Sequence, residues 1–319
     1  MKKGNKSNFS IKRINTSPYF SASFSQLEFD TIKKLTGIEI LPSNSPSIVS
    51  ALITNTHTDF STISNEQLDA CELLIHPNSG YDNFPREFIA DAKFPMIIGN
   101  PIRAHAVTNY ILSSLLAHYS SIPTQSAWSP TRSWPRKLLS ELNIMILGIG
   151  HIGTLLKKSL APLVREIRIY DPYAGFPDLD LRNIDVLIPA CSLNKQNFHF
   201  INTELLQQLN ENFLFINAAR GALVKTEDLL SILAKRPDAY AILDVFEKEP
   251  ADFQELQMKA HNLKLSSHIA GVYRNIDYST AEFEAKVISD FLTLKQNEFE
   301  KIYKTMNLKN RLIENDFLI

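Results

Sequence analysis

Three side chains in the second half of the chain are of types that transfer protons and bind anions. Arg220 follows the apolar run FLFINAA, Glu249 follows AYAILDV, and His268 follows NLKLSS. Taken alone, an arginine or an acidic loop at a strand end is usually solvated, and a lone histidine is more often structural. If the three runs are parallel strands, however, their carboxyl ends share one edge of a sheet, and the side chains can converge on one crevice.

A guanidinium, a carboxylate and an imidazole in one crevice fit the interconversion of a 2-keto acid and a 2-hydroxy acid. The guanidinium of Arg220 can bind the substrate carboxylate as a fork and polarise the carbonyl oxygen. When a hydride adds to C2, an imidazolium at His268 donates a proton to the developing alkoxide. A carboxylate beside the ring, such as Glu249, orients the imidazole and holds its proton. In the oxidation direction, the same histidine acts as the general base.

The stretch ILGIGHIG places Gly148, Gly150 and Gly153 in a G-x-G-x-x-G register between a predicted strand and a predicted helix. Glycines there allow a tight turn, close approach to a pyrophosphate and helix-to-strand packing, while the helix N-terminus faces the phosphates. Asp171, eighteen positions after Gly153, can accept hydrogen bonds from the adenosine ribose hydroxyls and repel a 2′-phosphate. No basic residue directly follows it, so the pattern favours NAD. The alternative is that Asp171 only makes a turn with Pro172.

The composition is that of an ordinary globular protein without a charge bias toward a polyanionic partner. The chain has 319 residues, of which 44% are hydrophobic and 21% are charged, and its formal net charge is -1. We therefore expect neither nucleic acid nor a membrane as a partner, and no apolar run approaches the roughly 20 residues that span a bilayer. Cys71 and Cys191 lie far apart and form no C-x-x-C pair, so we expect no disulfide scaffold, no metal and a reducing cytoplasm.

The N-terminus is locally basic and polar. Its basic residues are Lys2, Lys3, Lys6, Lys12 and Arg13. Because no apolar segment follows them, they do not indicate a signal peptide. We expect a loose tail that leads into the first strand.

From about residue 140 onward, short apolar runs alternate with helix-like segments. The runs have the lengths of strands and occupy residues 142–148, 165–171, 184–190, 213–219, 239–245 and 262–267. Residues 152–163 have helical spacing, and possible helix caps stand at Asn202, Thr203 and Thr226. This alternation predicts a parallel sheet with helices on both faces.

The first hundred residues repeat the pattern less clearly and predict a smaller α/β domain. Its candidate strands are SIKRIN, GIEIL, SALITN, CELLIH and FPMIIG, and residues 25–37 form a candidate helix that ends at Gly37. A long amphipathic helix is expected over residues 102–122, followed by a loop rich in proline, serine and tryptophan. A helix that begins near Ile276 could carry the chain back to the first domain.

These elements predict an α/β fold of two doubly wound parallel-sheet domains, Rossmann-like or flavodoxin-like, with the cofactor domain inserted in the substrate domain. The expected first part of the substrate domain is residues 1–103, and the cofactor domain is residues 104–272. Residues 273–319 supply the return helix and complete the substrate domain.

Four motifs in this order and spacing resemble the D-isomer-specific 2-hydroxyacid dehydrogenase family. They are the glycine motif with its downstream aspartate, INAARGALV, LDVFEKEP and SSHIAG, and the similarity covers roughly residues 75–275. The resemblance implies that Arg220 binds the substrate, that His268 is the acid/base, and that Glu249 is its carboxylate partner. It also implies a two-domain α/β fold, NAD as the cofactor, and a homodimer with the long helix near 104–119 at the interface.

The resemblance also implies the remaining binding residues. In the loop HPNSGYDNF, the backbone amides near Asn78, Ser79 and Gly80 would receive the substrate carboxylate, with a plain glycine turn as the alternative. Asp244 resembles a family position near the nicotinamide. The residues assigned to the cofactor are Gly148, Gly150, His151, Ile152, Gly153, Asp171, Ala218, Asp244, His268 and Gly271.

Three segments depart from the family pattern. The loop CSLNKQN has Ser192 where a proline is expected, and the long helix has Asn109 where a glutamate is common. The loop NPIRAHAV before that helix is shorter than usual and carries Arg103 and His105. These two side chains could contact a phosphate or a carboxylate, but we favour surface positions at the start of the helix.

The sequence therefore predicts a cytoplasmic, NAD-dependent oxidoreductase that acts on a small D-2-hydroxy acid or its 2-keto acid. Candidate substrates are 3-phosphoglycerate, glycerate with hydroxypyruvate or glyoxylate, lactate, and 4-phosphoerythronate, with a phosphoglycerate-type activity favoured. The alternative from another class is an NAD(H)-sensing binding protein of the same fold, such as a transcriptional corepressor. Such a protein can keep the catalytic trio, so the trio does not decide between the two.

Overall fold

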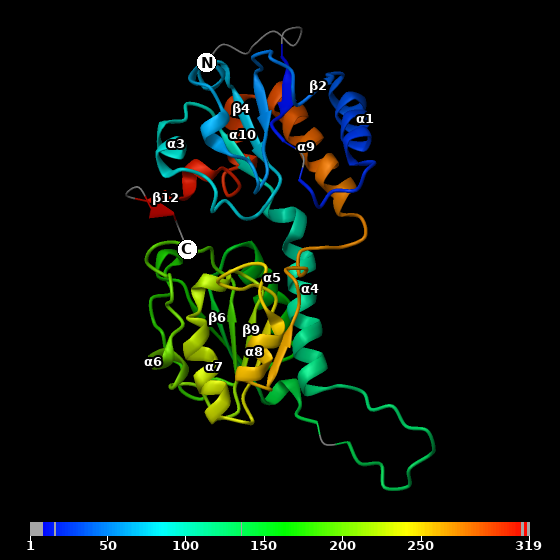
Figure 1. Ribbon diagram of the computed structural model, residues 1–319, viewed down its shortest axis with the longest axis vertical. Helices are drawn as coiled ribbons and strands as arrows, with labels where there is room; N and C mark the ends of the chain where they lie inside the picture. The colour runs from blue at the N-terminus through cyan, green and yellow to red at the C-terminus, as the bar shows by residue number, and fades with distance from the viewer. Residues whose placement is uncertain (1–8, 16, 135, 314–315, 318–319) are drawn as a thin grey trace. The chain divides into compact units, whose positions relative to one another are not determined.

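The chain forms two compact units, which we call unit 1 and unit 2 (Figure 1). Unit 1 comprises the residues up to Arg103 together with Val272–Leu318, and unit 2 is built from Ala104–Gly271. The computed structural model describes residues 9–15, 17–134, 136–313 and 316–317. The first three lysines of the expected N-terminal tail lie outside the described residues.

Unit 1 contains a five-stranded sheet in which every neighbouring pair of strands is parallel. The strand order is β2-β1-β3-β4-β5. The strands are β1 (Ile11–Arg13), β2 (Ile40–Leu41), β3 (Ala51–Ile53), β4 (Leu73–His76) and β5 (Met96–Ile98). Each strand falls within one of the five predicted runs, so these predictions are confirmed.

Helices cover both faces of this sheet because successive strand residues point to opposite faces. The helices of unit 1 are α1 (Phe24–Thr36), α2 (Asn65–Ala70), α3 (Arg86–Asp91), α9 (Ile276–Thr293) and α10 (Gln296–Ile302), with short 3₁₀ turns at Phe60–Thr62 and Leu308–Arg311 and a hairpin of β12 (Leu312–Ile313) and β13 (Asp316–Phe317). Ile53 and Ile75 pack with α1, α9 and α10, whereas Leu52 and Leu74 pack with α3 on the other face. Helices α1 and α9 lie side by side (Figure 1), and α1 ends at Gly37 in the left-handed conformation, as predicted.

Arg13 is the last residue of β1, within the predicted strand SIKRIN, and its side chain is buried. Its Nε donates to Glu28 Oε1 at 2.9 Å, and its Nη2 donates to Glu284 Oε1 at 2.5 Å. Both carboxylates are buried, and the rings of Phe20 and Phe24 lie 5.7 and 5.3 Å from the guanidinium carbon. Burial raises the pKa of Glu284 well above its usual value, although the charge of Arg13 opposes this shift. The ion cluster therefore joins β1, α1 and α9 inside unit 1.

Unit 2 contains a six-stranded parallel sheet with the order β11-β10-β9-β8-β6-β7. Its strands are β6 (Asn143–Leu147), β7 (Glu166–Tyr170), β8 (Val186–Pro189), β9 (Leu214–Asn217), β10 (Tyr240–Leu243) and β11 (Leu263–Leu265). Every predicted strand after residue 140 is present. Two parallel sheets in one chain confirm the predicted α/β fold class. From β6 the chain passes to β7 on one side of that strand and then to β8 on its other side. This reversal creates a crevice at the carboxyl edge between β6 and β8.

The helices of unit 2 also lie on both faces of their sheet. They are α4 (Asn100–Tyr119, which begins in unit 1), α5 (His151–Leu160), α6 (Thr203–Leu206), α7 (Thr226–Lys235) and α8 (Phe253–Lys259), with 3₁₀ turns at Leu139–Glu141, Pro172–Ala174 and Gly221–Leu223. Helices α4 and α5 contribute to one core cluster, and α6 and α7 contribute to the other. The residues after α4, 120–134, run out from unit 2 as an extended loop (Figure 1), as their composition predicts.

Three expectations about helix starts need correction. The segment NPIRAHAV is not a loop, because α4 already begins at Asn100; Pro101 fits its first turn, where a missing N–H is tolerated. Asn202 caps α6 as predicted, since its side chain accepts a backbone hydrogen bond at 3.1 Å. Thr226 does not cap α7, of which it is the first residue; its N–H instead donates to Glu247 Oε1 at 2.5 Å. Thr203 likewise is the first residue of α6.

We expect Arg13→Met to lower the free energy of unfolding by about 3–5 kcal/mol, because it leaves Glu28 and Glu284 buried without their cation. Urea unfolding followed by circular dichroism measures the loss. The control Lys34→Met removes an exposed charge from α1 and should change stability by less than about 0.5 kcal/mol. A loss in Arg13→Met no larger than that of the control would contradict the assignment.

Candidate functional site

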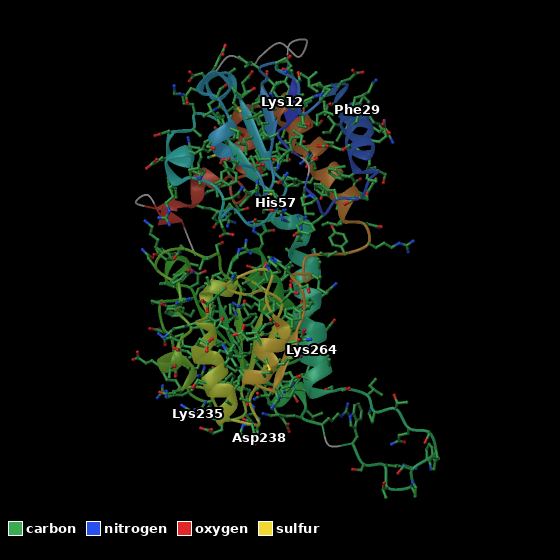
Figure 2. All side chains as sticks on the ribbon, in the orientation of Figure 1. Lys12, Phe29, His57, Lys235, Asp238 and Lys264 are labelled. Carbon is green, nitrogen blue, oxygen red and sulfur yellow. The ribbon has the colours of Figure 1, made fainter. Side chains whose placement is uncertain are left out.

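Arg220, Glu249 and His268 all follow strands that are neighbours in the sheet of unit 2. Strands β9, β10 and β11 are adjacent and parallel, so the three residues stand at one shared carboxyl edge. Figure 2 labels Lys235 and Asp238 at the other end of unit 2, before β10 begins. The tertiary structure thus brings together three strand ends that are far apart in the sequence.

His268 and Glu249 form a direct pair. His268 Nδ1 lies 2.8 Å from Glu249 Oε2, and Glu249 Oε1 accepts a hydrogen bond from the Phe246 N–H at 3.0 Å. Because a carboxylate can only accept, this pair places a ring proton on Nδ1. The His268 side chain is 54% exposed, and no residue that the structure describes forms a hydrogen bond with its Nε2. Nε2 is therefore the ring atom that can exchange a proton with a ligand.

Asp244 is fully buried and holds the backbone that carries His268. Its Oδ1 accepts hydrogen bonds from the Ser266 hydroxyl at 2.6 Å and the Ile269 N–H at 2.9 Å. Its Oδ2 accepts from the Ala270 N–H at 2.8 Å, and its carbonyl accepts from the His268 N–H at 2.8 Å. His268 has a φ of 54°, which is uncommon for a residue other than glycine and persists only where the surroundings enforce it. The four bonds to Asp244 supply that constraint.

Asn217, the last residue of β9, organises the turn that carries Arg220. Its Nδ2 donates to the Arg220 carbonyl at 2.9 Å, and its Oδ1 accepts from the Ala219 N–H at 3.1 Å. A Cβ on Gly221 would lie 1.9 Å from the carbonyl carbon of Phe246, so only glycine fits where this turn meets the segment that leads to the glutamate. The turn that carries Arg220 and the segment that leads to Glu249 thus pack backbone against backbone.

Asn217 is a site residue that the sequence analysis missed. The available signal was an amide at the end of an otherwise apolar strand, directly before the turn. Such a side chain is buried only where hydrogen bonds satisfy it, and Asn217 is fully buried. Arg220 itself is partly buried, and its Nη1 donates to the Ala219 carbonyl at 2.7 Å.

The glycine motif forms the predicted turn between β6 and α5. Gly148 has a φ of 98°, and a Cβ there would lie 2.7 Å from Cys191 Cβ. A Cβ on Gly153 would lie 2.1 Å from the Gly148 carbonyl oxygen, so this position needs glycine for helix-to-strand packing. Gly150 is the N-cap of α5 and has open space on its Cβ side, which is where a ligand could approach the backbone.

Asp171 is buried and makes the turn that was considered as the alternative to a ribose contact. Its Oδ2 accepts from the Ile149 N–H at 2.8 Å, and its Oδ1 accepts from the Ala174 N–H at 3.1 Å. Each carboxylate oxygen has a second acceptor position, so these bonds leave room for further donors. Asp171 therefore joins the glycine motif to the turn after β7.

A cavity of about 120 Å³ lies beside the glycine motif. The rings of Tyr170 and Phe200 stack with centroids 5.6 Å apart, and Tyr173 donates a hydrogen bond to Gln196. The cavity is lined by Leu147, Gly148, Tyr170, Pro172, Tyr173, Pro189, Cys191, Gln196, Asn197, Phe200, Ile201 and Leu223. Its walls come from β6, β7, β8 and the segments that follow β7, β8 and β9, which makes it part of the crevice at this edge.

The atypical loop CSLNKQN supports itself with asparagine side chains. Asn194 Oδ1 accepts from the Asn197 N–H at 2.9 Å, and Asn197 Oδ1 accepts from the Asn194 N–H at 2.7 Å. Asn197 Nδ2 also donates to the Ser192 carbonyl at 2.7 Å. These bonds order the loop without the proline that the family pattern has at Ser192.

The other predicted cofactor residues occupy the same edge of unit 2. His151 and Ile152 are the first residues of α5 and are partly buried, Ala218 follows β9 and is buried, and Gly271 follows the His268 loop. Asn109 is exposed on α4.

The predicted anion-receiving loop, Asn78–Gly80, follows β4 in unit 1. The Gly99 N–H donates to the carbonyls of His76 and Asn78 at 2.8 and 3.1 Å, and a Cβ on Gly99 would lie 2.4 Å from Pro77. Among the described residues, no partner accepts a hydrogen bond from the backbone N–H of any of the three loop residues. The carbonyls of His76 and Asn78 are thus hydrogen-bonded within unit 1, whereas the backbone N–H groups of Asn78–Gly80 remain available to a ligand.

His76 holds the same loop from within the core of unit 1. It is buried, its Nε2 donates to the Gly80 carbonyl at 2.8 Å, and its Nδ1 lies 3.0 Å from the Thr54 hydroxyl. Burial lowers the pKa of His76 to about 4, so the ring is neutral at pH 7. Since a carbonyl only accepts, the proton of the neutral ring is on Nε2.

Arg103 does not have the surface position that we favoured from the sequence. It lies in the first turn of α4, is partly buried, and donates from Nη1 to the Pro77 carbonyl at 2.9 Å. Burial lowers the pKa of Arg103. Because α4 begins at Asn100, Arg103 is already part of the helix, and its side chain reaches the loop after β4. His105 is exposed, as expected.

The described residues contain neither a cluster of metal-ligating side chains nor a membrane-spanning helix. No group of three or more His, Cys, Asp or Glu side chains within them is arranged to hold a metal ion. No helix in the described part of the chain is both long and apolar enough to cross a membrane.

Comparisons with known proteins point to one family. The family model for D-isomer specific 2-hydroxyacid dehydrogenase, NAD binding domain, matches residues 112–270. A glyoxylate reductase from Thermofilum pendens is 33% identical over 156 residues, which are 45% of this chain and 46% of that protein. A glyoxylate/hydroxypyruvate reductase from Arabidopsis thaliana is 30% identical over 219 residues, 65% of this chain and 64% of that protein. Each alignment spans less than two thirds of the relative's length.

A solved structure extends the similarity to the whole fold. The NAD+-bound 3-phosphoglycerate dehydrogenase of Entamoeba histolytica superposes with a TM-score of 0.68 at 16% identity. The superposition covers 92% of this chain and 98% of that one. At this identity the likeness establishes the shared fold of both units.

We expect the free energy of unfolding to fall between about pH 6.5 and pH 4, with His76 contributing about 3 kcal/mol of the loss. The unfolded chain takes up a proton on His76 below its ordinary pKa of 6.5, whereas the folded protein keeps the ring neutral to about pH 4. This contribution is therefore complete above the first value and lost below the second. Urea unfolding at several pH values measures it. His76→Gln keeps a donor toward Gly80 but cannot titrate, and an identical pH dependence in this variant would refute the role of His76.

Proposed function

Since the chain belongs to the D-isomer specific 2-hydroxyacid dehydrogenase family, we propose that it is an oxidoreductase that interconverts a small D-2-hydroxy acid and its 2-keto acid with NAD. The observation that carries this proposal is the His268–Glu249 pair at the carboxyl edge of β9, β10 and β11. A histidine oriented by a carboxylate, with its second nitrogen open, meets the requirement for proton transfer at a carbonyl oxygen.

His268 is assigned the proton transfer at the oxygen on C2. In reduction, its Nε2 donates a proton to the developing alkoxide, and in oxidation the neutral Nε2 accepts the proton of the hydroxyl. Glu249 keeps the proton on Nδ1 and stabilises the imidazolium charge. The left-handed backbone of His268 and its bonds to Asp244 hold the ring in place.

The substrate carboxylate is assigned to Arg220 and to the loop Asn78–Gly80. A guanidinium binds a carboxylate as a fork, and three consecutive N–H groups can bind its oxygens as well. The support for the loop is that its N–H groups have no partner among the described residues and that His76 and Gly99 hold its carbonyls. The support for Arg220 is its place in a turn that Asn217 fixes.

The residues beside β6 fit a dinucleotide, which supplies the hydride when bound in its reduced form. Gly150 leaves its backbone approachable at the N-terminus of α5, where N–H groups can bind the pyrophosphate. Asp171 would accept the ribose hydroxyls and disfavour a 2′-phosphate, so we propose NAD rather than NADP. The remaining assigned cofactor residues, which are predictions from the family resemblance, are His151, Ile152, Ala218, Asp244 and Gly271.

Glyoxylate and hydroxypyruvate are the first substrates to test. The two relatives described above are a glyoxylate reductase and a glyoxylate/hydroxypyruvate reductase, whereas the phosphoglycerate-type activity favoured from the sequence rests on no particular residue. The proposed working form is a cytoplasmic homodimer with α4 at the interface. Both cysteines are free, in keeping with a reducing compartment. Sedimentation equilibrium tests the dimer, and a monomer mass at micromolar concentration would reject it.

We expect NADH oxidation with glyoxylate or hydroxypyruvate to exceed that with pyruvate and with the keto acids related to 3-phosphoglycerate and 4-phosphoerythronate. NADPH should support at least about tenfold lower kcat/KM, because Asp171 repels its extra phosphate. Absorbance at the nicotinamide band measures both. If no keto acid is reduced while NADH still binds, the enzyme assignment fails and the NAD(H)-sensing binding protein takes its place.

We expect His268→Ala to lower kcat by about 10²–10⁴-fold, because general acid–base catalysis is lost. Arg220→Ala should instead raise KM sharply, since the carboxylate fork is removed. Steady-state kinetics on both variants separates these effects, and NADH binding measured by fluorescence checks that the cofactor site is intact. A His268→Ala enzyme with the wild-type kcat would show that the proposed proton transfer is wrong.

A further inference from the structure

Arg103 is a partly buried cation that the proposed mechanism does not use. Its Nη1 donates to the Pro77 carbonyl, which takes one of the five N–H donors of the guanidinium. No carboxylate among the described residues lies within 4.0 Å of its nitrogens. Burying a cation removes its hydration, and a single hydrogen bond to a neutral carbonyl compensates this loss only in part. The position is therefore suited to a negative group that the chain itself does not supply.

The carboxylates nearest to Arg103 do not neutralise it. Asp277 and Glu284 act on it only from beyond ion-pair distance, and Glu284 already accepts a hydrogen bond from Arg13. Burial has the largest effect on the pKa of Arg103 and lowers it. Tyr273, Asp277 and Glu284 raise this pKa, but by less than burial lowers it. The charge of Arg103 therefore remains available to a ligand.

The guanidinium stands next to the open donors of the β4 loop. Pro77 directly precedes Asn78, so only the C=O and C–N bonds of one peptide separate the bonded carbonyl oxygen from the Asn78 nitrogen. With standard bond lengths, Arg103 Nη1 lies no more than about 5.5 Å from that nitrogen. An unpaired cation and three consecutive unpaired N–H groups thus occupy one place in unit 1. Each of these two observations independently indicates an anion.

We infer that Arg103 binds the carboxylate of the substrate together with the backbone N–H groups of Asn78–Gly80. The N–H groups orient the carboxylate, and the positive charge of Arg103 favours a carboxylate over a neutral group. Arg103 is thereby a substrate-binding residue of unit 1 that the mechanism above does not use. This inference rests on the proposed function for the identity of the anion.

The test compares Arg103→Gln and Arg103→Lys with the wild-type protein in steady-state reduction of the best 2-keto acid by NADH. Glutamine keeps an N–H donor for the Pro77 carbonyl but has no charge. We expect Arg103→Gln to raise KM by about ten- to a hundredfold and to change kcat by less than about threefold, since an ionic hydrogen bond is lost in binding. Arg103→Lys keeps the charge but not the fork, so its KM should rise by about three- to tenfold.

The control is Lys34→Gln, which removes an exposed charge of unit 1 on α1 and should leave KM and kcat unchanged. If Arg103 only positions the loop through Pro77, Arg103→Gln keeps the wild-type KM, and the inference is overturned. A loss confined to phosphorylated substrates would also overturn it, because the anion would then be a phosphate. Should Arg103→Gln not fold, Arg103→Lys decides: a raised KM supports the inference and an unchanged KM rejects it.

A binding measurement separates this inference from the proposed function. Oxamate carries the carboxylate of a 2-keto acid but is not reduced, and its binding to the NADH-loaded full chain can be followed by calorimetry. We expect Arg103→Gln to weaken oxamate binding at least tenfold, with NADH binding unchanged. If the wild-type protein reduces no keto acid, the proposed function fails, yet this comparison still tests Arg103. Equal oxamate affinities in wild type and Arg103→Gln would reject Arg103 as an anion ligand.

Discussion

The buried carboxylate of Asp244 is the interaction on which the site in unit 2 depends. A carboxylate without water is unfavourable unless donors satisfy it, and Asp244 receives three, from Ser266, Ile269 and Ala270. Its backbone donates to the Asn217 carbonyl and accepts from the His268 N–H, which ties the end of β9 to the loop after β11. A single residue at the end of β10 therefore sets the geometry between the Arg220 turn and the His268 ring.

Unit 1 uses the same physical device on a smaller scale. His76, buried and neutral, and the N–H of Gly99 bind the carbonyls of the β4 loop from inside. When carbonyls are held in this way, the peptide planes are fixed and the N–H groups of the loop are preorganised for a ligand. Arg103 binds the carbonyl just before these donors. In both units, buried polar contacts orient the groups at a strand end that are available to a ligand.

The strands and the glycine motif could be predicted because their signals are local. A short apolar run bounded by turn residues indicates a buried parallel strand, and all eleven strands β1 to β11 fall within such runs. Gly153 is demanded by its own neighbourhood, since a side chain there meets the preceding turn. Thr226 was misread as a helix cap, and the ion cluster of Arg13 was not predicted, because their partners are far away in sequence: Glu247 for the first and Glu284 for the second. No local pattern of charge or helix capping contains that information.

The sequence by itself determined the class of fold, the order of the elements and the residue types at each strand end, because hydrophobic periodicity and glycine placement are written along the chain. Only the tertiary structure decided which of those strand ends are neighbours and which polar side chains are buried. In the folded chain His268 pairs with Glu249, while Asn217 and Asp244 hold the turns around that pair. Arg103, expected at the surface, is instead partly buried and has no carboxylate partner among the described residues. The physical reason is that burial and hydrogen-bond partnership belong to contacts between distant segments, which exist only once both parallel sheets have formed.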